Sequence, residues 1–259
     1  MNIPEVAPDA AVVARLRAAG CVFAEDEAAL LVEAAATAAQ LDALVARRVA
    51  GEPLEQVLGW AEFCGRRFVV EPGVFVPRRR TELLVREAAA LARPGAVVLD
   101  LCCGVGAVGA AVDGLVGTVE LHAADVDPAA VRCARRNVDG TVYEGDLYEP
   151  LPGSLRGRVG VLVANAPYVP TAAIALMPPE ARDHEARAAL DGGADGLDVQ
   201  RRVIAGAPPW LTAGGALLVE TSDRQAPATL AAFAAAGLAA RMVEDDDLGG
   251  TIVVGVLEP

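Results

Sequence analysis

The spacing of apolar positions changes along the chain, from a helical period to the short runs of buried strands. Between residues 8 and 50, apolar side chains recur three or four positions apart, which predicts helices. Gly20 and the acidic run Glu25-Asp26-Glu27 interrupt the pattern and indicate helix ends. Residues 61–70 carry aromatic and β-branched side chains on either side of Gly65, which predicts a hairpin. Residues 71–77 are rich in proline and glycine, so we expect a loop there, followed by a helix over residues 81–92.

From residue 95 onward, apolar runs alternate with helical segments, which is typical of a doubly wound α/β fold with a parallel sheet. The expected strands are residues 96–101, 119–125, 141–144, 159–164, 215–221, 238–243 and 250–257. The expected helices are residues 106–112, 128–138, 196–211 and 224–236. The pattern therefore predicts a helical domain over residues 1–55, a hairpin and linker over 56–80, and an α/β domain over 81–259.

Charge and cysteine content narrow the function classes. The net charge is −13, and such a surface repels phosphate backbones, so direct binding of nucleic acid is disfavoured. The run Arg78-Arg79-Arg80 is the one conspicuous basic segment. The five cysteines form no C-x-x-C pair, and with the two histidines they have no metal-ligand spacing, so we expect neither disulfides nor a metal site. No uninterrupted apolar stretch suits a bilayer and the start does not resemble a signal peptide, so we expect a cytoplasmic protein.

The ends of the first two predicted strands of the sheet carry candidate binding residues. In an open α/β sheet, ligands bind at the carboxyl ends of the strands. The first strand runs into a turn in which glycines let backbone N–H groups approach a ligand: Cys102, Cys103, Gly104, Val105 and Gly106. The next strand ends at Asp125, whose carboxylate can accept the hydroxyl hydrogens of an adenosine ribose. Asp127, directly before Pro128, is the better helix cap, so Asp125 is expected to be free for the ligand.

Two further strand ends complete the candidate site. After the third strand, Asp146 can accept from an adenine amino group while Leu147 packs on the ring, although a simple surface turn fits these residues equally well. After the fourth strand, Asn165-Ala166-Pro167-Tyr168 combines an amide, a rigid turn and an aromatic ring. These strand ends favour an adenosine-bearing cofactor. A dehydrogenase is one interpretation, but the fourth segment and Cys102, which replaces the first glycine of a dinucleotide fingerprint, favour S-adenosyl-L-methionine.

Several segments, in order, resemble the protein-(glutamine-N5) methyltransferases that modify the glutamine of the Gly-Gly-Gln loop in peptide-chain release factors. The matching segments are residues 52–59, 63–68, 76–82, 102–106, 165–168 and 189–197. The resemblance implies a Rossmann-like class I S-adenosylmethionine-dependent methyltransferase domain after a small helical substrate-recognition domain. It also implies an Asn-Pro-Pro-Tyr active site. By position, Asn165 accepts from the substrate amide, Ala166 offers its carbonyl oxygen, Pro167 completes the turn and Tyr168 walls the pocket. Residues 102–106, Asp125, Leu147 and Asn165 fall where the family holds the cofactor.

The chain departs from the family pattern at three places. Ala166 stands where the first proline is usual, Arg79-Arg80 where Pro-Glu is usual, and Glu185-Ala186 where Glu-Pro is usual. These changes affect the loops that meet the substrate. The leading hypothesis is methylation of a glutamine in a release factor or similar protein. The alternatives are an enzyme of the same fold that acts on a small metabolite or a nucleic-acid amine, and a non-catalytic cofactor-binding protein.

Overall fold

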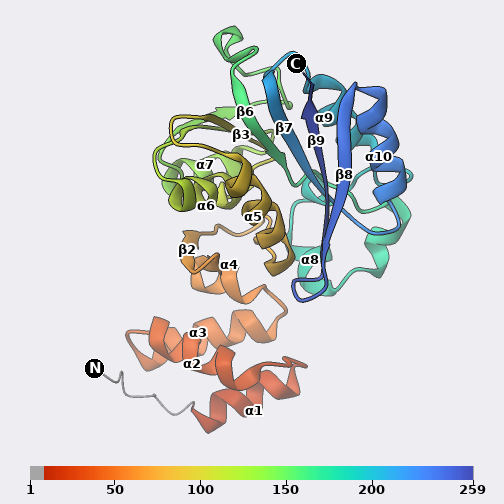
Figure 1. Cartoon of the computed structure of the whole chain (residues 1–259). Helices are drawn as coiled ribbons and strands as arrows, with labels where there is room; N and C mark the ends of the chain where they lie inside the picture. Colours follow the sequence, from red (N-terminus) through yellow and green to blue (C-terminus); the bar gives the residue numbers. More distant parts are fainter. Residues whose placement is uncertain (1–8, 259) are drawn as a thin grey trace.

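The structure is a computed structural model that describes residues 9–258, so the outermost residues of the predicted domains, 1–8 and 259, lie outside the described part. Four helices come first (Figure 1): α1 (Ala10–Ala18), α2 (Ala24–Ala34), α3 (Ala38–Val49) and α4 (Leu54–Leu58). The side chain of Asp9 caps α1 by accepting from the amide of Ala11 at 2.8 Å. Leu16, Leu31 and Val45 meet fully buried in a separate small core. The helical period of this region is therefore confirmed.

A hairpin and a loop connect these helices to the sheet. Strands β1 (Trp60–Phe63) and β2 (Arg66–Val69) pair antiparallel around Gly65, which has a left-handed φ of +68°. Phe63 and Phe68 bury their rings against the helices of the large domain. The short helix η1 (Arg79–Thr81) leads into α5 (Glu82–Leu91). The predicted domain boundary after residue 55 falls inside α4, and the boundary after residue 80 falls inside η1.

The large domain contains a seven-stranded sheet in the order β5-β4-β3-β6-β7-β9-β8. The strands are β3 (Val97–Leu101), β4 (Glu120–Asp125), β5 (Thr141–Glu144), β6 (Val159–Ala164), β7 (Leu211–Thr221), β8 (Leu238–Asp245) and β9 (Gly250–Leu257). The first five strands are parallel, as predicted. The expectation of a parallel sheet is wrong for β9, which lies between β7 and β8 and runs antiparallel to both. A tight turn joins β8 directly to β9, and such a turn can only produce an antiparallel pair.

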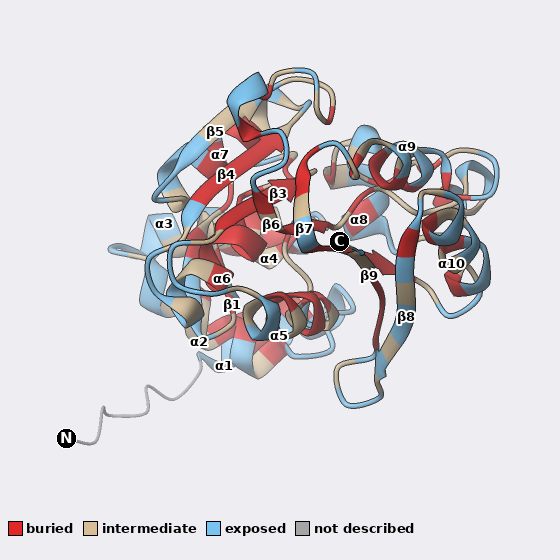
Figure 2. Cartoon of the chain, turned by 45° about the horizontal axis from the view of Figure 1, so that its top comes forward, coloured by how far each residue is buried: buried red, intermediate tan, exposed pale blue. Residues whose placement is uncertain are grey.

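Helices cover both faces of this sheet (Figure 1). They are α5, α6 (Ala107–Val116), α7 (Pro128–Asn137), α9 (Asp198–Gly206) and α10 (Ala226–Ala235). Helix α8 (Pro179–His184) and the short helices η2 (Gly153–Leu155), η3 (Thr171–Leu176) and η4 (Arg187–Ala189) lie in the loops. One core lies between the sheet and α5, α6 and α7, and a second lies between the sheet and α9 and α10. Figure 2 shows the central strands as the most buried part of the domain. Burial on both faces explains why these strands read as continuous apolar runs.

The connection pattern places the site. β3 pairs with β4 on one side and with β6 on the other, so the strand order reverses at β3. Leu101, near the end of β3, is in register with Ala124 of β4 and Ala164 of β6. The loops that follow these three strands therefore begin side by side, at the position where open α/β sheets bind ligands.

Candidate active site

A cavity of about 340 Å³ opens at the carboxyl ends of β3, β4 and β6. This volume lies within the range of about 300–1,000 Å³ that small-molecule sites occupy. Most of the residues predicted from the sequence line it: Cys102, Cys103, Gly104, Val105, Asp125, Asp146, Leu147, Asn165, Ala166, Pro167 and Tyr168. Gly106 does not line the cavity. The structure thus brings four strand ends that are distant in sequence to one space.

The two glycines of the turn after β3, Gly104 and Gly106, have different structural roles. Gly104 and Gly106 both have left-handed φ angles, +54° and +78°. A Cβ added at Gly106 would lie only 2.4 Å from Cγ2 of Val138, so this glycine lets α6 pack closely beside α7. A Cβ at Gly104 would meet no atom within 4 Å, so this residue faces open space. Gly104 is the glycine that leaves room for a ligand.

Asp125 holds the glycine turn as well as facing the cavity. Its Oδ2 accepts from the amide of Gly104 at 2.8 Å and its Oδ1 accepts from the amide of Asp127 at 2.9 Å. Asp127 caps α7 by accepting from the amide of Ala129 at 2.8 Å, so that prediction is confirmed. The expectation that Asp125 is left free is wrong, because the tight turn brings backbone N–H groups onto both of its oxygens. Each carboxylate oxygen has two lone pairs, so each can still accept once more.

Asp146 and Leu147 form the wall beyond β5. Asp146 accepts from Nη2 of Arg202 at 2.6 Å, in an ion pair at the edge of the cavity. Leu147 is buried and has a left-handed φ of +49°. A branched residue in this conformation is strained, and such strain is found at ligand sites. The ion pair with Arg202 holds Asp146 at the cavity, and the sequence did not indicate this partner.

Asn165 and its neighbours form the opposite end of the cavity. The Nδ2 group of Asn165 donates to Oγ1 of Thr81 at 3.3 Å, and this leaves the Oδ1 atom as an acceptor. Within residues 9–258, neither Oδ1 of Asn165 nor the carbonyl oxygen of Ala166 accepts a hydrogen bond. Tyr168 donates its hydroxyl to Oε1 of Glu220 at 3.2 Å, and burial raises the pKa of Tyr168 well above its ordinary value. The tyrosine is therefore a neutral wall at physiological pH.

Two charged residues lie against Tyr168: Glu220, which the sequence did not single out, and Arg80, the last residue of the basic run. Glu220, in β7, is 1% exposed, and its Oε1 also accepts from Nε of Arg80 at 3.3 Å. The guanidinium carbon of Arg80 lies 5.9 Å from the centre of the Tyr168 ring. Arg80 lines the cavity. In the part of the chain that the structure describes, Oε2 of Glu220 is buried without a hydrogen-bond partner.

The third departure from the family pattern, at Glu185-Ala186, has a local structural explanation. Glu185 accepts from the amide of Val76 at 3.1 Å and from the guanidinium of Arg78, so it holds the loop before η1. The amide of Ala186 donates to the carbonyl oxygen of Gly73 at 2.9 Å. A proline at position 186 has no N–H group and could not make this bond. The alanine thus adds a backbone tie between two loops near the site.

Sequence reasoning missed other residues that line the cavity, of which Asp100, Thr81 and Val126 are the most informative. Asp100 is 1% exposed and accepts from the amide of Gly109 at 2.8 Å. Burial, with a smaller contribution from the nearby charge of Asp125, raises the pKa of Asp100 to about 7. The available signals were a carboxylate inside an apolar strand and an apolar residue, Val126, directly after Asp125. Thr81 gave no such signal, because its role depends on a contact with a residue 84 positions away.

Neither a metal-binding cluster nor a membrane-spanning helix is found among residues 9–258. In residues 9–258, no group of three or more His, Cys, Asp or Glu side chains could hold a metal ion. No helix in that part of the chain is both long and apolar enough to cross a membrane.

Comparison with known proteins identifies the family. Residues 65–193 match the family model described as "Methyltransferase small domain". A release factor glutamine methyltransferase from Geobacter sulfurreducens is 41% identical over 217 residues, which is 82% of this chain and 75% of the relative. The chain belongs to the release factor glutamine methyltransferase family. The resemblance inferred from its motifs is confirmed.

A relative with a different name is similar to this chain at a slightly lower identity. A Streptomyces pristinaespiralis protein named 4-amino-L-phenylalanine/4-methylamino-L-phenylalanine methyltransferase is 36% identical over 203 residues, which is 74% of this chain and 69% of the relative. Among solved structures, a Pyrococcus furiosus methyltransferase superposes with a TM-score of 0.59 at 15% identity, covering 83% of this chain and 98% of that one. The structural likeness supports the methyltransferase fold that the sequence predicted.

Proposed function

We propose that this chain transfers a methyl group from S-adenosyl-L-methionine to the side-chain amide nitrogen of a glutamine in a peptide-chain release factor. The observation that carries the proposal is a pair of acceptors at one end of the cavity, Oδ1 of Asn165 and the carbonyl oxygen of Ala166, which have no hydrogen-bond partner among residues 9–258. A primary amide presents two N–H hydrogens, and two acceptors match them. Family membership supports the same reaction, because the curated relatives carry this name.

The residues at the other end of the cavity fit this cofactor better than a dinucleotide. A dinucleotide places its pyrophosphate against the amides of a glycine turn. Here the amide of Gly104 already donates to Asp125 at 2.8 Å, and the Asp125 carboxylate would repel a pyrophosphate. S-adenosyl-L-methionine has no phosphate, and its sulfonium and ammonium groups outweigh its one carboxylate, so carboxylates of the cavity attract it. The cavity chemistry therefore favours methyl transfer over hydride transfer.

Particular residues would hold each part of the cofactor. The remaining lone pairs of Asp125 would accept from the ribose hydroxyls, and Asp146 would accept from the adenine amino group. Val126 and Leu147 supply apolar surface for the adenine ring. Gly104 leaves the space that the cofactor needs beside the turn. When bound, the cofactor supplies an electrophilic methyl group.

The protein's own contribution is alignment. An amide nitrogen is a poor nucleophile because its lone pair is delocalised into the carbonyl group. Asn165 and Ala166 would hold both N–H hydrogens and turn the nitrogen toward the methyl group, while Thr81 fixes the orientation of the Asn165 amide. Such positioning can lower a barrier by about 7–11 kcal/mol at best. No strong base is needed, because the amide proton becomes acidic once the nitrogen has gained the methyl group.

The partner follows from the same proposal. The substrate is a glutamine-bearing protein, the N-terminal helices recognise it, and the encounter takes place in the cytoplasm. The division into domains at residues 1–55, 56–80 and 81–259 belongs to this proposal. The charge of −13 disfavours direct contact with nucleic acid.

Labelled S-adenosyl-L-methionine tests the proposal directly. The protein is incubated with it and a release factor, and the reaction is compared with one that contains a release factor whose Gly-Gly-Gln glutamine is replaced by alanine. We expect label only in the unmodified factor. Asn165→Ala should lower kcat by about 10²–10³-fold, as for loss of a transition-state hydrogen bond, while cofactor affinity stays within threefold. Equal loss of transfer and cofactor affinity would give Asn165 a structural role.

A second candidate function is N-methylation of the aromatic amine of a free amino acid. The relative from Streptomyces pristinaespiralis favours it, since that protein is named for such substrates. An aniline nitrogen is planar and carries two hydrogens, so the same acceptor pair suits it. Label that appears in a small molecule and not in the release factor would select this candidate, and cofactor binding without any transfer would indicate a non-catalytic protein.

A further inference from the structure

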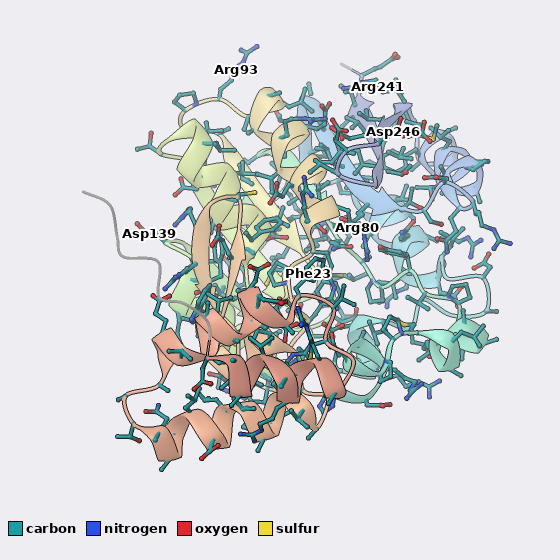
Figure 3. All side chains as sticks on the ribbon, turned by 90° about the horizontal axis from the view of Figure 1, so that it is seen from below. Phe23, Arg80, Arg93, Asp139, Arg241 and Asp246 are labelled. Carbon is teal, nitrogen blue, oxygen red and sulfur yellow. The ribbon has the colours of Figure 1, made fainter. Side chains whose placement is uncertain are left out.

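Arg80 occupies a position in the acceptor end of the cavity that the proposed reaction does not use. It directly precedes Thr81, whose hydroxyl accepts from Asn165 at 3.3 Å. Its side chain lines the cavity and is 42% exposed. Figure 3 shows Arg80 near the middle of the molecule when seen from below, whereas Arg93 and Arg241 lie toward the edge. The guanidinium is therefore available to a molecule that enters beside Asn165.

Contacts with Glu220 and Tyr168 fix the position of the Arg80 guanidinium. Its Nε donates to Oε1 of Glu220 at 3.3 Å, and its carbon atom lies 5.9 Å from the centre of the Tyr168 ring. Within residues 9–258, the Glu220 hydrogen bond of Arg80 is made by Nε and not by the terminal nitrogens, and the guanidinium charge also interacts with the Tyr168 hydroxyl. Glu220 is 1% exposed and does not line the cavity, whereas Arg80 does. The carboxylate is therefore buried and the guanidinium lies at the cavity surface. The pair presents a fork of N–H donors to the cavity.

Such a fork has a specific chemical preference. The planar guanidinium matches the two oxygens of a carboxylate and binds them with parallel charge-assisted hydrogen bonds. The three residues Gly-Gly-Gln contain no charged side chain, so the proposed protein loop by itself gives Arg80 no such partner. A glutamate, which is usual at this position in the family, would instead repel a carboxylate.

We propose that Arg80 selects an acceptor that carries a carboxylate close to the nitrogen to be methylated. This inference rests on the methyl-transfer activity proposed above and names the acceptor class within it. Two sources offer the required group: the α-carboxylate of a free amino acid, or an acidic side chain next to the target glutamine in a protein. Glu220 is the positioning residue that holds the guanidinium.

Matched acceptor pairs separate the carboxylate from the rest of the acceptor. The first pair is 4-amino-L-phenylalanine and 4-aminophenethylamine, which lacks the carboxylate. The second pair is a Gly-Gly-Gln peptide followed by glutamate and the same peptide followed by glutamine. Binding to the protein saturated with S-adenosyl-L-homocysteine is measured by calorimetry, so the result does not depend on turnover. Methyl transfer to the same four acceptors is measured separately.

Wild-type protein should bind the carboxylate member of one pair at least tenfold more tightly than its partner, and that pair identifies the source. Arg80→Gln should weaken this member about tenfold to a hundredfold, which is about 1.4–2.8 kcal/mol at 1.4 kcal/mol per factor of ten. The carboxylate-free member should change less than twofold. Arg80→Lys keeps the charge but loses the fork, so its loss should be smaller. Arg79→Gln removes the same charge from an exposed neighbour that does not line the cavity, and it should change binding less than twofold.

Three results would overturn the inference. They are equal binding of both members of each pair, equal weakening of both members by Arg80→Gln, and an Arg79→Gln effect as large as that of Arg80→Gln. If Arg80→Gln does not fold, as judged by its thermal unfolding, the comparison of Arg80→Lys with wild type decides the question on the same acceptors. Selective binding without methyl transfer would refute the proposed function and leave the assignment of Arg80 intact.

Discussion

Replacing Asp100 by asparagine should change how the stability of this protein depends on pH. The carboxyl group is 1% exposed, and burial raises its pKa from 3.8 to about 7. Between these values the folded state keeps a proton that the unfolded state has lost, so the free energy of unfolding falls as pH rises. A shift of about 3 units corresponds to about 4 kcal/mol, at 1.36 kcal/mol per unit. About 3 kcal/mol of this loss falls between pH 5 and pH 8.

The new side chain in the Asp100→Asn variant has nearly the same shape as the carboxyl group and an oxygen that still accepts from the amide of Gly109, but it does not titrate. Without cofactor, the variant should be close to wild type near pH 4 and more stable than wild type by up to about 4 kcal/mol at pH 8. Urea unfolding at several pH values, followed by tryptophan fluorescence, measures both curves, and their difference cancels the titration of all other groups. A difference that does not change with pH would refute the reasoning, as would a variant that is less stable at pH 8.

Two further predictions concern the packing around the site, and a third concerns the ion pair between Arg48 and Glu27 in the N-terminal helices. Asp125→Ala removes the acceptor of the Gly104 amide and should weaken cofactor binding before it lowers kcat, with a loss of about 1–3 kcal/mol in stability; calorimetry that finds wild-type cofactor affinity would remove Asp125 from the ribose site. Gly106→Ala should cost about 2–4 kcal/mol, because φ is +78° and the new Cβ would lie 2.4 Å from Val138. Gly104→Ala is its control, with strain of only about 1–2 kcal/mol because no atom lies within 4 Å; equal losses in thermal unfolding would contradict the packing argument. Arg48→Ala leaves the buried carboxylate of Glu27 uncompensated and should cost about 3–5 kcal/mol in urea unfolding, and a loss below about 1 kcal/mol would show that the pair is not effectively buried.

The sequence by itself determined the elements and most of the residues at the strand ends. Apolar periodicity and glycine or proline turns depend on residues a few positions apart, so most of the helices, the hairpin around Gly65 and the seven strands could be predicted. The short helices α4 and α8 were not predicted. Because the carboxyl ends of neighbouring parallel strands share one edge, the same pattern predicted that Asp125, Asp146 and Asn165 would line one cavity.

Tertiary structure alone decided which side chains contact one another at the site and how burial shifts their pKa values. Arg80 meets Glu220 across 140 positions and Tyr168 meets Glu220 across 52, and no local pattern encodes either contact. The raised pKa of Asp100 arises from removal of water by both layers of the fold. The antiparallel β9 and the occupied oxygens of Asp125 likewise depend on which segments pack together. Local sequence specifies the conformation of each helix and strand. Contacts between distant residues and the removal of water from charged groups arise only in the assembled core, and these contacts and this desolvation set the chemistry of the site.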